Sequence, residues 1–195
     1  MIMKNFFDII APIYEKIHSG AEKIFKKLES ITYFQSSDNV LDLGGGTGRI
    51  SKFLANKVKK IVVVDSSQNM IGGCKKHAGL FCVFAQAEEL PFSEQSFNKI
   101  IVINAFHHFQ NQKQVIKEMK RVLANDGRVV IEEFNPVKMF GKLIVIIEKM
   151  FCLGSHFHSP ISLINLFSMN GFKARIVNEN KSTYYLIAEK LTNSL

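Results

Sequence analysis

The chain has 195 residues, of which 47% are hydrophobic and 22% are charged, with a formal net charge of +8 and an isoelectric point near 9.4. This length suits one folded domain with a sizeable core, and the composition excludes a disordered chain. The basic charge is compatible with nucleic acid, an anionic membrane surface or an acidic substrate. No block of five or more like charges occurs, however, which favours ordinary solvated helix faces.

The cysteines and the N-terminal sequence indicate the cellular compartment in which the protein is expected. The odd number of cysteines and the lack of a C-x-x-C pair predict buried thiols in a reducing compartment rather than disulfides or a zinc site. The three are Cys74, Cys82 and Cys152. Lys4 and Asp8 interrupt the apolar start, so we expect no signal peptide and a cytoplasmic protein. The longest apolar run, residues 143–147, is too short to cross a bilayer.

The first elements in chain order are helical. Apolar residues recur at helical spacing through residues 5–31, and Pro12 suits the first turn of a helix. We expect residues 1–36 to form lid helices over the site. A polar break at residues 36–39 separates them from the first strand.

A glycine-rich turn follows in VLDLGGGTGRI, residues 40–50. The pattern predicts a buried strand, a turn almost without side chains, and a helix whose apolar face is Ile50, Phe53, Leu54 and Val58. Glycine is needed where the backbone takes positive φ or a ligand approaches the main chain, and a helix start offers free N–H groups. The turn matches neither the dinucleotide fingerprint nor the phosphate loop, because Arg49 stands where both need glycine.

Strands and helices then alternate. We predict strands over residues 60–65, 80–85, 99–106 and 128–134, one helix from Ser66 or Ser67, and another over residues 115–123. Apolar strands separated by helices indicate parallel strands covered on both faces, with their carboxyl ends at one edge, where ligands bind. Polar side chains follow these strands: Asp42, Asp65, Gln86, Asn104, Glu132 and Glu133. Since strand residues alternate between faces, only one of the paired glutamates can face a pocket.

The pattern changes after Pro136. Residues 137–158 are strongly apolar with scattered lysines, and we expect a helix that is either a substrate cover or an ordinary core or dimer helix. Ser159-Pro160 marks the start of the next helix, and two strands follow from residue 172. We therefore predict a single α/β domain over residues 1–195. Its sheet is Rossmann-like, doubly wound and seven-stranded, mostly parallel with a C-terminal antiparallel hairpin, and has helices on both faces.

Asp65 ends the second strand, 21 residues after Gly44. A carboxylate at this position can accept hydrogen bonds from both hydroxyls of a ribose, as it does in dinucleotide folds. An acidic helix cap is the alternative. The neighbouring glycine turn favours the ribose interpretation.

The motif D-x-G-x-G-x-G resembles the first motif of class I S-adenosylmethionine-dependent methyltransferases, in which the turn runs under the amino-acid part of the cofactor. Residues 85–109, AQAEELPFSEQSFNKIIVINAFHHF, resemble the subgroup that includes the ubiquinone and menaquinone C-methyltransferases. So do FDIIAPIYE at 7–15 and RVLANDG at 121–127. Gln86 and Asn98 stand where the family usually has aspartate, although Gln86 can still hydrogen-bond an adenine edge.

This resemblance implies S-adenosylmethionine as the cofactor. The cofactor-binding residues it implies are Asp42, Gly44, Gly45, Gly46, Gly48, Asp65, Ser66, Met70, Gln86, Ala87, Glu88 and Asn104. A sulfonium methyl is already activated, so transfer needs in-line placement, and a base only if the acceptor must lose a proton. The candidates beside the methyl group are Asn104, His107, His108 and Tyr14, while packing of the strand-to-helix turn is the alternative role for either histidine.

We expect a small, apolar or ring-bearing acceptor. The charge suggests a nucleic-acid methyltransferase as an alternative, but the Asn/Asp-Pro-Pro-aromatic signature is missing at residues 104–107 and no RNA-binding appendage is visible. A non-catalytic cofactor-binding protein is the third hypothesis. His156 and His158 are half of a metal site at most, since no third ligand has convincing spacing, so no metal is expected. Residues 137–158, the apolar insert between the fifth strand and the next helix, are also compatible with a homodimer.

Overall fold

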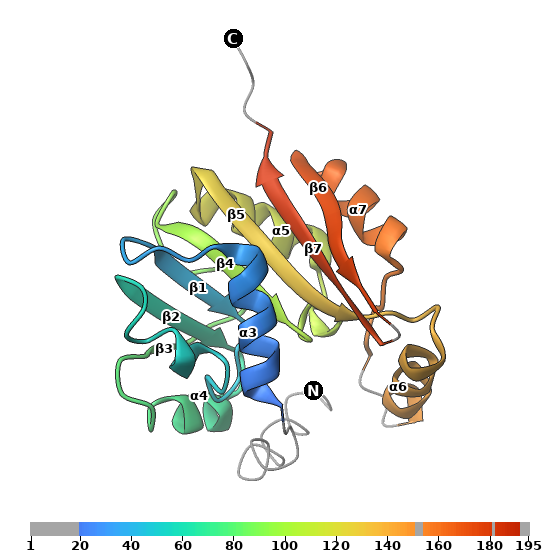
Figure 1. The fold of residues 1–195 in the computed structure, drawn as a ribbon, viewed down its shortest axis with the longest axis horizontal. Helices are drawn as coiled ribbons and strands as arrows, with labels where there is room; N and C mark the ends of the chain where they lie inside the picture. The colour runs from blue at the N-terminus through green and yellow to red at the C-terminus, as the bar shows by residue number, and fades with distance from the viewer. Residues whose placement is uncertain (1–19, 151–153, 181, 192–195) are drawn as a thin grey trace.

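A seven-stranded sheet runs through the centre of the computed structural model, which describes residues 20–150, 154–180 and 182–191 (Figure 1). The strand order is β3–β2–β1–β4–β5–β7–β6. Strands β1 to β5 are parallel, and β7 runs antiparallel to both β5 and β6. The strands are β1 (Asn39–Leu43), β2 (Lys60–Asp65), β3 (Phe81–Phe84), β4 (Phe97–Ile103), β5 (Leu123–Phe134), β6 (Phe172–Glu179) and β7 (Thr183–Lys190). The predicted fold class is confirmed.

Helices cover both faces of this sheet. They are α3 (Ala21–Thr32), η1 (Ser51–Phe53), α4 (Gln68–Cys74), η2 (Phe106–His108), α5 (Gln112–Val122), α6 (Met139–Met150) and α7 (Pro160–Ser168). Phe25 and Leu28 of α3 pack with alternate strand residues such as Val40 and Tyr185 on one face. Helices α5 and α7 cover the other face, behind the sheet in Figure 1. Each large apolar side chain buried in these layers contributes about 1.5–3 kcal/mol.

The N-terminal segment is described only from residue 20. Its helix α3 packs on the sheet through Phe25 and Leu28, and Tyr14 lies outside the described residues. Helix α6 follows the carboxyl end of β5, at the lower right of Figure 1. Across the described ranges, no helix combines the length and apolarity that a bilayer span requires.

Two predicted helix starts are confirmed by their caps. The Ser67 hydroxyl accepts a hydrogen bond from Met70 N at 3.1 Å, and the Ser159 hydroxyl accepts one from Ser162 N at 3.2 Å. Each bond satisfies one of the amides that a helix start leaves without an intrahelical acceptor. Helix α4 therefore begins directly after Asp65, at the edge where the parallel strands end.

The prediction of an α-helix after the glycine turn is wrong. The segment is a series of tight turns around η1, in which Phe53 N donates to Ile50 O and Leu54 N to Ser51 O. Ile50, Leu54 and Val58 are nevertheless buried. Apolar spacing of three to four residues does not distinguish an α-helix from consecutive 3₁₀-type turns, which bring the same side chains to one face.

Two strand boundaries differ from the prediction by three residues or more. Strand β4 ends at Ile103 rather than at residue 106, because Asn104 adopts a left-handed conformation with φ of 50° that no strand continues. Strand β5 begins at Leu123, opposite Phe97, five residues before the predicted start at residue 128.

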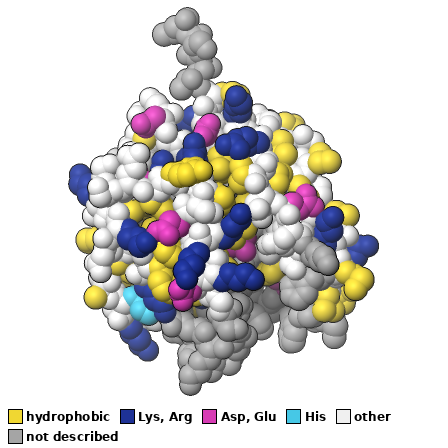
Figure 2. Space-filling view, in the orientation of Figure 1, with side chains coloured by type: hydrophobic (Ala, Val, Ile, Leu, Met, Phe, Trp, Pro, Cys, Tyr) yellow, Lys and Arg dark blue, Asp and Glu magenta, His cyan; other side chains and the backbone are white. Residues whose placement is uncertain are grey.

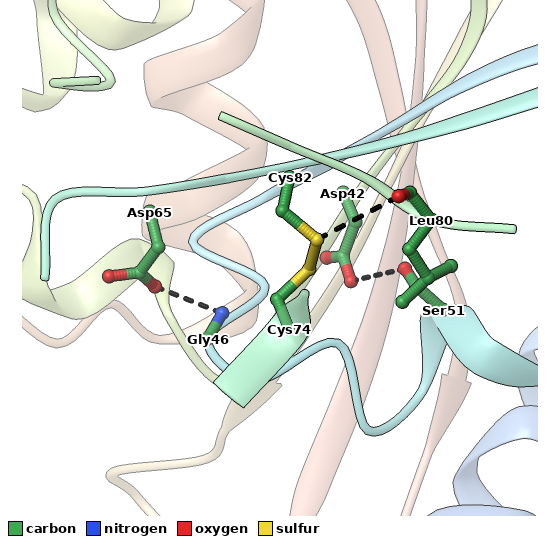
Figure 3. Close-up of a disulfide and its surroundings, with 7 residues drawn as sticks. All are labelled: Asp42, Gly46, Ser51, Asp65, Cys74, Leu80 and Cys82. Atoms are coloured by element: carbon green, nitrogen blue, oxygen red, sulfur yellow. Dashed lines mark hydrogen bonds between the residues drawn. A yellow bond between two sulfur atoms is a disulfide. The ribbon is translucent and has the colours of Figure 1, made fainter. Parts of the chain in front are cut away.

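The cysteine prediction is wrong for two of the three residues. Cys74 at the end of α4 and Cys82 in β3 form a disulfide, with Cα atoms 6.1 Å apart (Figure 3). The link between α4 and β3 turns back on itself, and this brings the two positions within the Cα separation that a disulfide needs. Their spacing in the sequence matches no pattern that signals pairing.

Candidate active site

The glycine turn joins the carboxyl ends of β1 and β2. The amides of Gly44 and Gly45 both donate to Val64 O, at 2.8 and 3.2 Å. Gly44 has φ of 72°, and a Cβ atom there would lie only 2.8 Å from the Cβ of Ala105. Glycine is therefore required at this position both by its conformation and by the close approach of the chain after β4.

Asp65 lies directly beside this turn. One carboxylate oxygen accepts from Gly46 N at 2.9 Å (Figure 3), and the other accepts from Ser67 N at 2.8 Å. Hydrogen bonds from amides to a carboxylate are charge-assisted, so they fix both the side chain and the loop. The structure thus brings together the two features on which the cofactor prediction depends.

Asp42, in β1, lies against the glycine turn at Gly45 and contacts Ser51. Asp42 is 2% exposed, and one of its carboxylate oxygens accepts from the Ser51 hydroxyl at 2.6 Å (Figure 3). A Cβ atom on Gly45 would collide with the same carboxyl group. Burial raises the pKa of Asp42 to about 6, although the Ser51 hydroxyl and the Arg49 charge oppose the rise. The resemblance implies direct cofactor binding for Asp42; in this structure its carboxyl group is buried against Gly45 and Ser51.

Arg49 has a role that sequence reasoning missed. This side chain is 6% exposed, and its charge lowers the pKa of both Asp42 and Glu132. Burial, the larger effect, raises the pKa of Glu132 to about 7. A cation beside two buried carboxylates reduces the cost of burying them. The sequence offered one indication of this role: Arg49 is a single basic residue between the last glycine of the turn and the apolar residue Ile50.

Asn104 directly follows β4, the strand that pairs with β1. Its φ of 50° is unusual for a non-glycine residue, and its amide oxygen is buried without a hydrogen-bond partner among the described residues. A buried acceptor left unsatisfied costs about 1–3 kcal/mol, so a ligand that brings a donor would relieve this cost. The glycine cradle and this oxygen together fit a ligand that carries an amino group, as the methionine part of S-adenosylmethionine does.

The other residues implied for the cofactor lie around the ends of β2 and β3: Ser66, Met70, Gln86, Ala87 and Glu88. Gln86 is exposed, whereas Met70 and Ala87 are buried in the core. Glu88 accepts from Asn111 N at 3.2 Å, next to the first turn of α5. Its carboxylate therefore bonds to a helix start in this structure.

The Leu-Pro-Phe loop is anchored by a pair of residues that sequence reasoning did not single out. Arg121 donates to Leu90 O at 2.9 Å and to Phe92 O at 2.6 Å, and Glu118 accepts from Leu90 N at 2.8 Å. Arg121 and Glu118 also form an ion pair on α5. Two motifs of the resemblance that are distant in the sequence are thus one structural unit, which holds the loop after β3.

His107 lies between two carboxylates. Its Nδ1 is 2.7 Å from Glu133 of β5, and its Nε2 is 3.3 Å from Glu148 of α6. Burial alone would lower the pKa of His107, but the two carboxylates outweigh it and raise the pKa to about 9. The ring also stacks on Phe157, with centroids 4.3 Å apart. Glu133 faces this cluster and Glu132 faces Arg49, as strand alternation predicts for neighbouring residues.

His108 is the second histidine of the same turn. Its Nδ1 lies 3.1 Å from the Ser155 hydroxyl and 3.9 Å from Glu148. Burial and the charge of His107 lower its pKa to about 3. Glu148 lies in the apolar segment 137–158, and its contact with the two histidines was not predicted from the sequence. The apolar spacing of a helix does not indicate which residues a single glutamate on it will contact.

The other histidine pair lies beside this cluster: burial lowers the pKa of His158, and the charge of Glu133 opposes this shift. His158 contacts Gln112 at 2.7 Å and Ser162 at 2.9 Å, while His156 is exposed and donates its backbone N–H to His107 O at 2.7 Å. These bonds hold the segment after α6 against η2 and α5.

This sheet order, the glycine turn and Asp65 beside it define a class I S-adenosylmethionine-dependent methyltransferase. A family model described as a methyltransferase domain matches residues 41–131. A ubiquinone/menaquinone biosynthesis C-methyltransferase of Wigglesworthia glossinidia brevipalpis is 30% identical over 170 residues, which are 78% of this chain and 67% of that protein. The demethylmenaquinone methyltransferase of Thermotoga maritima is 33% identical over 141 residues, covering 68% of this chain and 61% of that protein.

A crystal structure of an S-adenosylmethionine-dependent methyltransferase from Thermotoga maritima has the same fold. Its TM-score is 0.79 at 19% identity, and the match covers 97% of this chain and all of that one. The chain belongs to the class I S-adenosylmethionine-dependent methyltransferases, and S-adenosylmethionine is its methyl donor.

Proposed function

We propose that the protein transfers a methyl group to a small, apolar or ring-bearing acceptor that binds between the carboxyl edge of the sheet and α6. The observation that carries this proposal is the contact of Glu148 with His107, which ties the apolar insert to the turn after β4. The quinone methyltransferases among the relatives support an acceptor of this kind.

In this proposal the cofactor lies along the turn at the end of β1. The backbone of residues 44–48 would contact its amino-acid part, Asn104 Oδ1 would accept from its amino group, and Asp65 would accept from both ribose hydroxyls. A carboxylate has room for about four hydrogen bonds, so ribose binding is compatible with the two amide bonds of Asp65. S-adenosylmethionine supplies a methyl group on a sulfonium, which needs no further activation.

The chain's own contribution to the reaction is then mainly placement. Holding donor and acceptor in line can supply about 7–11 kcal/mol of the barrier. His107 and His108 would line the acceptor side, with Glu133 and Glu148 fixing the orientation of His107. Tyr14 and the N-terminal lid remain part of the proposal, as does the assignment of residues 1–195 to one domain with the insert 137–158 as acceptor cover.

The charge distribution on the face drawn in Figure 2 and the exposed apolar side chains of α6 favour a small-molecule acceptor over a nucleic acid. Figure 2 shows lysine and arginine side chains scattered over this face among acidic ones rather than gathered in one stripe. Helix α6 instead exposes apolar side chains, with Met139, Leu143 and Ile146 all more than half exposed. An exposed apolar surface beside a site is typical of binding to apolar partners or ligands.

Methyl transfer from tritiated S-adenosylmethionine tests the proposal. The full chain would be incubated with a demethylated quinol, a catechol, a small amine and transfer RNA in parallel. We expect label in a ring-bearing acceptor and none in RNA. Label found in RNA alone, or in no acceptor by a protein that binds the cofactor, would contradict the acceptor class.

A further inference from the structure

We propose that His107, His108 and Glu148 form a binding site for one divalent transition-metal ion of the zinc class. One ligating atom from each of the three side chains lies within 4.8 Å of the other two. They come from η2 and from α6, and Glu148 follows His108 by 40 residues in the chain. This assignment goes beyond the proposed methyl transfer, and the binding itself does not depend on it.

The distances fit an ion between the side chains. Ligand atoms about 2.0–2.1 Å from a tetrahedral ion lie about 3.3 Å from one another. His107 Nε2 and Glu148 Oε1 are already 3.3 Å apart. His108 Nδ1 lies 3.9 Å from the other oxygen of Glu148 and 3.1 Å from the Ser155 hydroxyl. A rotation of this ring, whose side chain is 17% exposed, from Ser155 toward Glu148 completes the set.

Glu133 orients His107 for this role. It contacts Nδ1 at 2.7 Å, which directs Nε2 toward Glu148. A histidine that binds a metal commonly donates its other ring N–H to a carboxylate, and this outer partner sets the tautomer and the ring direction. Stacking on Phe157 further restricts the ring. The ligand is therefore held in place before any ion arrives.

The second oxygen of Glu148 is an independent indication. It is buried, the side chain is only 13% exposed, and no strong hydrogen bond satisfies it: the Ser155 hydroxyl helps to lower the pKa of Glu148, and His108 Nδ1 lies 3.9 Å away. A buried carboxylate oxygen is costly unless it is hydrogen-bonded, paired or bound to a metal. An ion between Glu148 and His108 would satisfy it.

The donor set indicates which ion. Two imidazoles and one carboxylate are the set of zinc sites that keep a fourth position open. In such a site the open position takes water or an oxygen of a ligand. If the acceptor binds beneath α6, as proposed above, the ion would hold an oxygen of a ring-bearing acceptor; this role alone rests on the proposed function.

Cobalt titration of the untagged full chain tests the site. After dialysis against a chelator, we expect one Co²⁺ per chain with visible absorption bands of a four- or five-coordinate ion, displaced by Zn²⁺. Glu148→Gln keeps the side-chain shape and should weaken Co²⁺ binding at least 10-fold. Glu133→Gln should weaken Co²⁺ binding by about 10–100-fold, because Glu133 does not contact the ion but orients its ligand His107.

His156→Ala is the matched control, since this exposed histidine lies in the segment after α6 and should leave Co²⁺ binding unchanged. Thermal unfolding of each variant verifies its fold. Failure of the wild-type chain to bind Co²⁺ or Zn²⁺ at micromolar concentrations would overturn the assignment, and so would undiminished binding by folded Glu148→Gln. Both readouts are independent of methyl transfer, so they fail or succeed separately from the proposed function.

Discussion

Replacing Asp65 with alanine tests the cofactor site most sharply. If this carboxylate accepts from both ribose hydroxyls, as proposed, the substitution removes two hydrogen bonds to a charged group, which contribute about 1.5–3 kcal/mol each. Losing both, with partial replacement by water, should cost about 3 kcal/mol of binding free energy. The dissociation constant of S-adenosylmethionine measured by calorimetry should therefore rise by about 100-fold.

The same substitution also removes acceptors for Gly46 N and Ser67 N, so stability must be measured in parallel. Asp38→Ala is the matched control. Asp38 is also buried and accepts a loop amide, Gln35 N at 2.8 Å, but it precedes β1 at the opposite end of that strand. Asp38→Ala should lower stability and leave affinity unchanged. A folded Asp65→Ala protein that binds the cofactor within threefold of wild type would refute the ribose role.

Three further predictions concern the framework of the site. The pKa of Glu132 is raised to about 7, so its stabilising contribution is complete below pH 4.5 and falls by about 3 kcal/mol as pH rises through 7. Glu132→Gln should reduce this loss in denaturant titrations, and an unchanged pH profile would contradict the assignment. Gly44→Ala should destabilise the fold by about 2 kcal/mol, because it combines positive φ with a close contact to Ala105, and an unchanged denaturation midpoint would count against it. Arg121→Ala should speed hydrogen exchange at Leu90 while exposed Lys117→Ala does not, and equal exchange rates would show that the loop holds without Arg121.

Much of the architecture followed from local patterns in the sequence. The apolar strands, the caps at Ser67 and Ser159, and the final hairpin were predicted correctly, because strand burial and capping depend on nearby residues. The proximity of Asp65 to the glycine turn was also predictable, since parallel strands end at one edge.

The failures have two physical causes: some contacts depend on how separate segments meet in the fold, and one local pattern of apolar residues is compatible with two structures. The disulfide of Cys74 requires a link that turns back on itself. Apolar spacing after the glycine turn could not distinguish a helix from tight turns. The contact of Glu148 with His107 joins two segments far apart in the chain, and no local pattern predicts it.

A crystal structure with S-adenosylhomocysteine would test the central claim most directly. We predict that both ribose hydroxyls lie within hydrogen-bond distance of Asp65 and that the amino-acid part of the ligand lies over residues 44–48. Its amino group should donate to Asn104 Oδ1. A ligand bound with its ribose away from Asp65, or outside the corner formed by β1, β2 and β4, would contradict the proposed cofactor site.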